Sequence, residues 1–291
     1  MTKEVDKYRH KTSFKYQIQF DEPVESRCQK SLKPGSRLES VRGESFMFSG
    51  TMIDAATGIT VAHAVTPEEE VMILRPQNGN EVRQVIGRCL KTFQDVQVRG
   101  ERYEYTMTAD MAVLELLPDF QLRRNSVQMD GREFRVKIYK GKRVPRNTPV
   151  MVVDQTGRIQ KGFIRREQFT DTTLEARRTA TNNLYNVLGI GNGSGMDQSA
   201  ITQEGDSGAL VLSLPSESSA DSEDDVLYVY GIVTALYSWP ENGAENSLTI
   251  ANSLGGVIPV MFEDESVVHK VGNIPVDDID FTQIAEPSSL P

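Results

Sequence analysis

The pattern of apolar and polar positions changes near Ser45. Before that point the chain is polar and mixed in charge, with one alternating stretch at Phe14–Phe20 that indicates a strand. After it, short apolar or alternating runs are separated by turn residues, which is typical of β-structure. The predicted strands are Phe46–Ile53, Gly58–Ala64, Val71–Arg75, Glu81–Cys89, Met111–Leu116, Phe134–Tyr139, Val150–Asp154, Arg158–Arg165, Ala209–Leu214, Leu227–Leu236 and Ser247–Ala251. Strands this short and closely spaced favour a sandwich or barrels.

Turn signals divide this series into units. Asn78–Asn80 and Gln155–Gly157 are predicted to form tight turns between paired strands. The periodicity lapses near Pro118–Gly131, where we expect a domain boundary. Ser253 is a candidate cap for a short helix, although Pro259 weakens that pattern. The predicted organisation is an N-terminal extension at 1–35, a first unit at 36–130, a second unit at 131–264 and an acidic tail at 265–291.

Composition and charge narrow the class of protein. Hydrophobic residues make up 38% of the 291 residues and charged residues 25%, an ordinary globular balance. Residues 201–291 hold 16 acidic residues and one lysine, a net charge of −15 within a total of −9. This argues against nucleic acid as the main partner. The start of the chain does not resemble a signal peptide, and no apolar run is long enough to span a membrane, so we expect a cytoplasmic protein without membrane contact.

The remaining compositional signals are negative or weak. Cys28 and Cys89 can form at most one disulfide and have no histidine beside them, so we expect no metal and no cofactor. Gly189–Gly195 lacks the Lys-Ser/Thr of a phosphate loop and is interpreted as a mobile loop. Ser216–Asp225 is rich in serine and acidic residues and is interpreted as an exposed hairpin tip, with a regulatory role left open. The oligomeric state is not indicated.

The strongest chemical signal is Gly205-Asp206-Ser207-Gly208, which is followed at once by an apolar strand. Glycine before such a serine lets the backbone turn tightly and point N–H groups to one spot. Two converging N–H donors are what a tetrahedral oxyanion requires. Taken alone, the motif is equally compatible with a surface turn.

His63 and Asp110 are the groups best placed to activate Ser207. His10 and His269 lie in the polar ends of the chain, whereas His63 follows an apolar run, a setting that also suits an ordinary core histidine. Asp110 stands directly before the apolar Met111–Leu116, where a carboxylate has no packing role beyond opening the strand. Its rivals lack this setting; they are Asp54, Asp95 and Asp119.

Taken together, these blocks resemble the chymotrypsin/trypsin family of serine peptidases, in that family's order of histidine, aspartate and serine. The blocks are Ser49-Gly50-Thr51 with Val61-Ala62-His63, Asp110-Met111-Ala112-Val113-Leu114, Gly205-Asp206-Ser207-Gly208 and, as a cleft-lining strand, Tyr230-Gly231-Ile232-Val233-Thr234. His63 and Asp110 are 47 residues apart, and Asp110 and Ser207 are 97 apart, which is close to the family's spacing. Other triad enzymes use other orders.

The resemblance implies an all-β fold of two six-stranded antiparallel Greek-key barrels, with the active site in the cleft between them and a short C-terminal helix. It implies that Ser207 attacks the scissile carbonyl, that His63 takes and returns the proton, and that Asp110 orients His63. The amides of Gly205 and Ser207 would form the oxyanion hole. We therefore expect a serine endopeptidase that cleaves protein or peptide substrates through an acyl-enzyme.

The sequence departs from the family pattern near the catalytic residues. Ala64 follows the histidine where secreted members carry cysteine, which fits a reducing compartment. No Ile-Val-Gly-Gly start is present to supply an amine for Asp206, so that carboxylate needs another partner or the enzyme is always assembled.

The predicted substrate pocket is also unusual. Thr234-Ala235-Leu236 replaces the family's Ser-Trp-Gly, and Ile201 stands where trypsin-like pockets carry an acid. We expect a shallow apolar pocket that favours a small or medium apolar P1 residue. Two other functions stay open. One is a protease-fold binding or regulatory module with little turnover, and the other is a serine hydrolase acting on a non-peptide acyl group.

Overall fold

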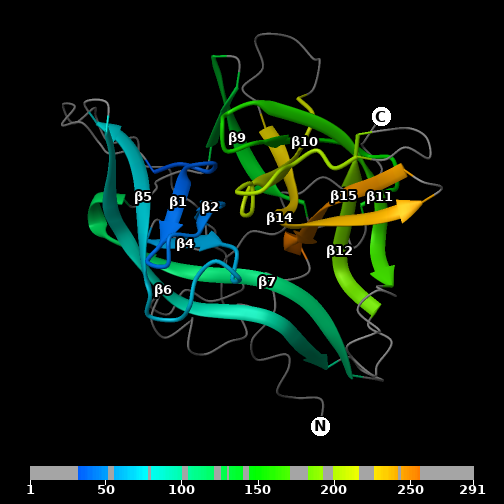
Figure 1. Cartoon of the computed structure of the whole chain (residues 1–291), viewed down its shortest axis with the longest axis horizontal. Helices are drawn as coiled ribbons and strands as arrows, with labels where there is room; N and C mark the ends of the chain where they lie inside the picture. Colours follow the sequence, from blue (N-terminus) through cyan, green and yellow to red (C-terminus); the bar gives the residue numbers. More distant parts are fainter. Residues whose placement is uncertain are drawn as a thin grey trace, which may run out of the picture.

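The computed structural model describes residues 32–51, 56–77, 80–99, 104–120, 126–129, 131–139, 144–170, 183–192, 199–215, 226–241 and 244–255. In this part of the chain the fold is almost entirely β (Figure 1). The first seven strands are β1 (Arg37–Ser40), β2 (Ser45–Met47), β3 (Gly50–Thr51), β4 (Thr57–Thr60), β5 (Glu70–Gln77), β6 (Asn80–Arg99) and β7 (Glu104–Leu116). A single 3₁₀ turn, η2 (Pro118–Phe120), follows β7.

The first sheet is a curled half-barrel whose two ends are joined by the chain itself. Its antiparallel pairs follow the order β2-β1-β5-β6-β7-β4-β3. β2 and β3 belong to one continuous segment: Phe48 N donates to Ser36 O on the β1 side, and Ser49 N donates to Ile59 O of β4. If that bent segment is counted as one strand, the sheet is a ring of six that runs β1, β2–β3, β4, β7, β6, β5 and back to β1. In chain order this is first, second, third, sixth, fifth, fourth.

The second unit is a closed barrel. Its strands are β10 (Pro149–Val153), β11 (Ile159–Thr170), β12 (Asn183–Gly191), β13 (Leu210–Ser213), β14 (Val226–Glu241) and β15 (Ala244–Ser253). Each pairs antiparallel with two neighbours in the ring β10-β11-β12-β15-β14-β13. This is the same order as in the first unit. The two-barrel, chymotrypsin-like architecture that the resemblance implied is therefore confirmed.

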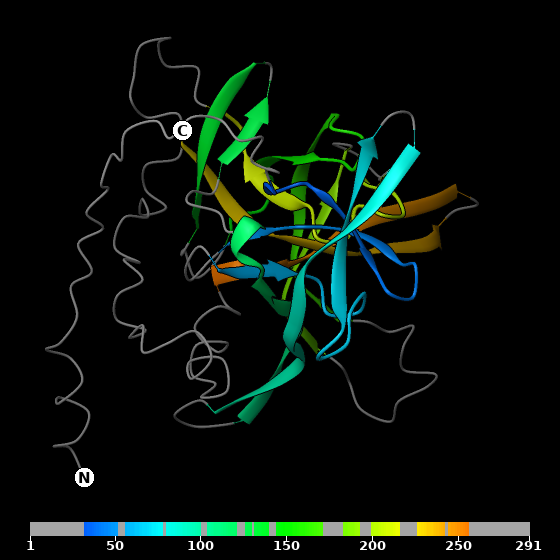
Figure 2. The same cartoon turned by 90° about the vertical axis from the view of Figure 1, so that its left-hand side faces the viewer.

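The remaining strands lie between the two units in the sequence, and the pairing that joins the two sheets is the parallel one between Met107 of β7 and Tyr185 of β12. β8 (Ser126–Met129) and β9 (Arg132–Ile138) form a hairpin, and β9 continues the second sheet by pairing parallel to β14. In the turned view this hairpin stands at the top of the molecule (Figure 2). β1 and β5 lie on one side of the molecule and β11, β12 and β15 on the other, and β6 and β7 run below from the first side towards the second (Figure 1).

The apolar core extends across both units. Phe46, Phe48 and Leu114 are fully buried in a cluster that also contains Leu210 and Ile232 of the second barrel. Leu32 belongs to the same cluster, so the end of the predicted N-terminal extension packs against the first unit. In the other direction, Met47 of β2 packs into the cluster of the second barrel. The two units therefore hold each other through β2.

Each of the eleven predicted strands overlaps an observed one, but three strands were missed: β1, β8 and β12. Gly189–Gly191, interpreted from sequence as part of a mobile loop, belongs to β12. The reason is close packing, because a β-carbon added to Gly191 would lie 2.9 Å from Leu248 Cδ2. The rest of that glycine-rich stretch lies outside the described residues.

The outer segments of the prediction are only partly described. Of the predicted C-terminal helix, Leu254 and Gly255 are described and are helical. Phe14–Phe20, the acidic loop at 216–225 and the tail at 265–291 lie outside the described residues, and the predicted domain boundaries stay predictions. Within the described ranges no helix combines the length and the apolar character needed to cross a bilayer.

Candidate active site

His63 and Asp110 are brought together by the pairing of β4 with β7. Thr60, the last residue of β4, lies opposite Ala112 of β7. Continuing this antiparallel register for two residues brings Ala62 opposite Asp110, and His63 follows in a turn. The structure thus differs in detail from the prediction, because His63 lies beyond its strand and Asp110 lies inside β7 rather than before it. Asp110 also lies beside a bulge in β6, between Gln94 and Val96.

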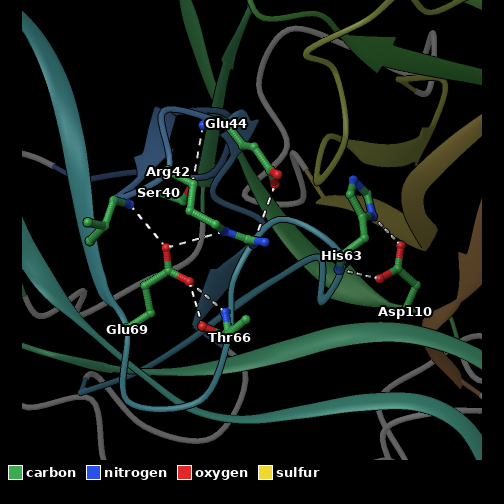
Figure 3. Close-up of polar contacts among 8 residues, drawn as sticks. Ser40, Arg42, Glu44, His63, Thr66, Glu69 and Asp110 are labelled. Atoms are coloured by element: carbon green, nitrogen blue, oxygen red, sulfur yellow. Dashed lines mark hydrogen bonds and ion pairs between the residues drawn. The ribbon is translucent and has the colours of Figure 1, made fainter.

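Both carboxylate oxygens of Asp110 bind His63. Asp110 Oδ1 accepts from the His63 main-chain N at 2.8 Å, and Oδ2 is 2.5 Å from Nδ1 (Figure 3). A carboxylate only accepts, so Nδ1 of the neutral ring carries the proton and Nε2 keeps its lone pair. Figure 3 shows the second ring nitrogen pointing away from Asp110. The side chain of His63 is 42% exposed and that of Asp110 18%. The pair therefore presents a proton acceptor to the surface.

The pKa of His63 is raised above its ordinary value of 6.5. The hydrogen bond to Asp110 is the largest cause; burial opposes it, and the negative charges of Asp110 and Glu44 add to it. Glu44 is held near His63 by a polar network between two turns (Figure 3). Arg42 lies 3.6 Å from Glu44 and 3.8 Å from Glu69. Glu69 in turn accepts from Val41 N and from Thr66 N, just beyond His63.

We predict that the activity of the protein falls on the acid side of a pKa above 6.5. His63 must be neutral to accept a proton, and its raised pKa keeps it protonated to a higher pH than a free histidine. A profile of kcat/KM against pH measures this. Glu44→Gln should move the inflection to lower pH by removing a negative charge, whereas Glu115→Gln, which alters an exposed carboxylate bound to Arg88, should leave it in place. An inflection below 6.5 in the wild type would contradict the prediction.

Ser207 is fixed from the first barrel through its main chain. Met47 N donates to Ser207 O at 2.7 Å, and Ser49 Oγ donates to Gly208 O at 2.7 Å. Thr60, three residues before His63, donates its hydroxyl to Met47 O at 2.8 Å. The loop that carries Ser207 and the strand that leads to His63 are therefore both bonded to Met47.

Gly208 permits this contact. Its φ is +92°, and an added β-carbon would lie 2.1 Å from Met47 O. Positive φ costs a residue with a side chain about 1–2 kcal/mol, and here the backbone of Met47 would also have to move.

Gly208→Ala is therefore expected to lower the free energy of unfolding by about 3 kcal/mol or more. Gly157→Ala is the matched control, because Gly157 has φ +82° but nothing within 4 Å of an added β-carbon. It should cost about 1–2 kcal/mol. Denaturant unfolding of the two variants measures the difference. Equal costs would show that the contact between Gly208 and Met47 does not constrain the fold.

The amides of the loop that carries Ser207 differ in whether they have an acceptor in the described part of the chain, and that of Glu204 has none. Asp206 N donates to Gln203 O, and Gly208 N donates to Val233 O. The amides of Gly205 and Ser207, in contrast, donate to no acceptor in the described part of the chain. These are the two amides that the sequence assigned to an oxyanion hole. Unpaired amides on either side of Asp206 are available to an incoming oxyanion.

The carboxylate of Asp206 has hydrogen-bond donors that were not predicted from sequence. The residue is fully buried, and its carboxylate accepts from Gln155 N and from Gln203 N, each at 2.9 Å. Gln155 Nε2 also donates to Glu204 O at 2.7 Å. Two main-chain amides thus bind the buried carboxylate of Asp206 and hold this loop in the conformation that the structure shows.

Gln155 is positioned by the turn between β10 and β11. Asp154 accepts from Thr156 N, Thr156 Oγ1 and Arg158 N. Burial raises the pKa of Asp154, but these hydrogen bonds and one from Gln160 outweigh it, so the pKa lies below its ordinary value. The turn was predicted from sequence, but its contact with the Ser207 loop was missed, because a glutamine 51 residues before Asp206 carries no distinctive pattern.

The relation between the His63 imidazole and the Ser207 hydroxyl is the untested part of the site. Among the described residues no hydrogen bond joins the His63 ring to the Ser207 hydroxyl, although both side chains are described. Catalytic hydrogen bonds are often longer without substrate and shorten when it binds. The structure thus brings together His63 with Asp110, and Ser207 with the unpaired amides, and among the described residues it shows no hydrogen bond between the two pairs.

The four predicted pocket residues fall into two groups. Thr234 is half-buried, and Ala235 and Leu236 are exposed, Leu236 at 47%. All three lie on β14 just after Val233, which exchanges hydrogen bonds with Gly208 and Ala209. Ile201, in contrast, packs in the core of the second barrel, 2.9 Å from a β-carbon added to Gly162. The assignment of Ile201 to a substrate pocket stays a prediction.

No protein-family model matches the chain, and no curated protein matches it. Solved structures do match over most of its length. A glutamic-acid-specific serine protease matches with a TM-score of 0.48 and 11% identity, over 79% of this chain and 98% of its own. The chymotrypsin of Cellulomonas bogoriensis has the same score and identity, over 80% and 96%. Protease A of Thermobifida fusca has a TM-score of 0.47 and 9% identity, over 80% and 96%. These values carry no information on individual site residues, and the fold assignment follows from the strand order described above.

Proposed function

We propose that the protein is a serine endopeptidase in which Ser207, His63 and Asp110 form the catalytic triad. The observation that carries this proposal is the double hydrogen bond between Asp110 and His63. It fixes the ring in the tautomer that a general base needs, and an ordinary core histidine has no requirement for it. The unpaired amides of Gly205 and Ser207, on the loop that carries the proposed nucleophile, support the same proposal.

The proposed reaction uses groups of this chain alone. Ser207 Oγ attacks the scissile carbonyl while His63 Nε2 takes the hydroxyl proton, and Asp110 stabilises the imidazolium that results. The carbonyl oxygen becomes an oxyanion that the amides of Gly205 and Ser207 bind, each worth about 3–4 kcal/mol in comparable sites. His63 then returns the proton to the leaving amine, and water repeats the sequence to release the acyl group.

One observation favours the alternative of a binding module with little turnover, namely the absence of a hydrogen bond between His63 and Ser207 in the described structure. A fluorophosphonate probe separates the two functions, because it reacts only with an activated serine. We expect the wild type to be labelled at Ser207 and Ser207→Ala to remain unlabelled. If neither protein is labelled and both are folded, the binding module is the better account.

The cytoplasmic location expected from sequence stays a prediction, because the state of Cys89 does not indicate a compartment. Cys89 is a buried free thiol, and burial raises its pKa to about 12. A thiol with this pKa is protonated at neutral pH and is therefore unreactive towards oxidants and disulfides.

A further inference from the structure

Thr202 takes the position that the sequence analysis gave to Ile201. Because Ile201 is buried in the second barrel, the next side chain turns towards β15, where the Thr202 and Thr249 hydroxyl oxygens are 2.8 Å apart. Thr249 is fully buried, whereas Thr202 is only partly buried. The feature next to the Ser207 loop is therefore a pair of hydroxyl groups rather than an aliphatic side chain.

Counting donors and acceptors shows which way this pair is oriented. Thr249 Oγ1 accepts from Ile201 N at 3.0 Å and from Thr202 N at 3.2 Å. These two bonds occupy both lone pairs of the oxygen, so the Thr249 hydroxyl must donate its own proton to Thr202 Oγ1. The proton of the Thr202 hydroxyl then has no acceptor among the described residues. Thr202 thus presents a hydrogen-bond donor.

This donor lies beside the path of a substrate side chain. Thr202 stands five residues before Ser207, and Gln203 between them binds Asp206. Thr249 is the cross-strand partner of Leu236 on β14, and cross-strand partners face the same side of a sheet. The exposed residues Ala235 and Leu236 follow directly after Val233, which is bonded to Gly208. A side chain attached to a carbonyl at Ser207 would therefore extend between this part of β14 and Thr202.

The charges around Thr202 indicate which kind of substrate group could accept its hydroxyl proton. Ala200, whose N donates to Ser247 Oγ, and the other groups bonded to this segment are uncharged. The nearest charge along the chain is Glu204, which is exposed. Among the described residues no cationic side chain is bonded to this segment, and Glu204 would repel a substrate carboxylate. A neutral carboxamide can accept the Thr202 proton without this cost.

We infer that the protein selects substrates with a carboxamide side chain, glutamine or asparagine, at P1, and that the Thr202 hydroxyl reads its carbonyl oxygen. This inference rests on the proposed serine-peptidase function. It differs from the small or medium apolar P1 residue expected from sequence, which rested on Thr234-Ala235-Leu236 as well as on Ile201 and stays a prediction.

The test compares peptides that differ only at P1, with glutamine and methionine as a pair of similar length and shape. In the wild type we expect kcat/KM for the glutamine peptide to exceed that for the methionine peptide by about tenfold, as one hydrogen bond allows. Thr202→Val, which keeps the shape and removes the hydroxyl, should reduce this ratio to about one. Thr202→Ser should retain the preference.

A fluorophosphonate assay run in parallel separates failure of the inference from failure of the proposed function. If Ser207 is labelled but methionine is cleaved as well as glutamine, or lysine or leucine is preferred, the carboxamide specificity is overturned and the hydrolase stands. The wild-type ratio decides this even if Thr202→Val does not fold. An unchanged ratio in a folded Thr202→Val protein would remove Thr202 from the mechanism of selection. Absence of both labelling and cleavage overturns the proposed function, and this inference with it.

Discussion

Ser207→Ala is expected to lower kcat for peptide cleavage by a factor of about 10⁵ to 10⁶. The variant has no hydroxyl to form the acyl-enzyme, and His63 and Asp110 then have no proton to transfer. Residues that act as a unit lose nearly all of their effect when one is removed. The loop should remain in place, because Ser207 is bonded to Met47 through its main-chain oxygen and Asp206 through its carboxylate. The melting temperature should therefore stay close to that of the wild type.

Steady-state kinetics with a fluorogenic peptide measures this loss, and thermal unfolding monitors the fold. Ser238→Ala is the matched control, because Ser238 is exposed on β14, away from the nucleophile loop. Its activity should stay within about twofold of the wild type, as expected for an exposed site. A folded Ser207→Ala protein that retains more than about one per cent of wild-type activity would exclude Ser207 as the nucleophile.

Asp110→Asn is expected to lower kcat by about 10⁴. Asp110 accepts from both the main-chain N and Nδ1 of His63, which keeps the lone pair on Nε2. An asparagine amide can donate to Nδ1 instead, which moves the proton to Nε2 and removes the base. The variant also loses the largest cause of the raised pKa of His63. The inflection of its residual activity should therefore move to lower pH.

The same kinetic assay over a range of pH measures both effects. Asp119→Asn is the control, because Asp119 was a rival to Asp110 by residue type and lies exposed in η2. It should leave both kcat and the pH profile unchanged. A folded Asp110→Asn protein with full activity would mean that the contact between Asp110 and His63 is structural only.

The fold and the central pair of the site could be anticipated because their signals are local or ordered along the chain. Alternating positions mark short strands wherever one face is buried, and His63 and Asp110 each adjoin an apolar strand. The order of the sequence blocks, histidine before aspartate before serine, then predicted that the two residues lie in one site. The observed pairing of Thr60 with Ala112 is the physical reason that this works.

The parts that sequence could not supply depend on contacts between distant segments. The two amide partners of Asp206 come from Gln155 and Gln203, which have no distinctive signal. The choice between Ile201 and Thr202 depends on which side chain enters the second barrel, a matter of one residue in register. A threonine at position 249, within the otherwise apolar run at 248–251, was the one available hint of a buried hydroxyl pair.

Strand ends were also set by tertiary contacts. β12 contains glycines that were interpreted from sequence as a mobile loop, but the absence of a side chain at Gly191 makes room for Leu248 of β15. β4 ends at Thr60 rather than at Ala64, because the chain must turn to place His63 against Asp110. Packing explains the first difference from the predicted strands, and the contact between His63 and Asp110 explains the second.

The crystal structure of the protein after reaction with diisopropyl fluorophosphate tests the central claim most directly. We expect phosphorus bonded to Ser207 Oγ, a phosphoryl oxygen within hydrogen-bonding distance of the amides of Gly205 and Ser207, and His63 Nε2 within about 3.2 Å of an oxygen of the adduct. An adduct on another residue, or one on Ser207 with the His63 ring out of reach, would contradict the catalytic triad.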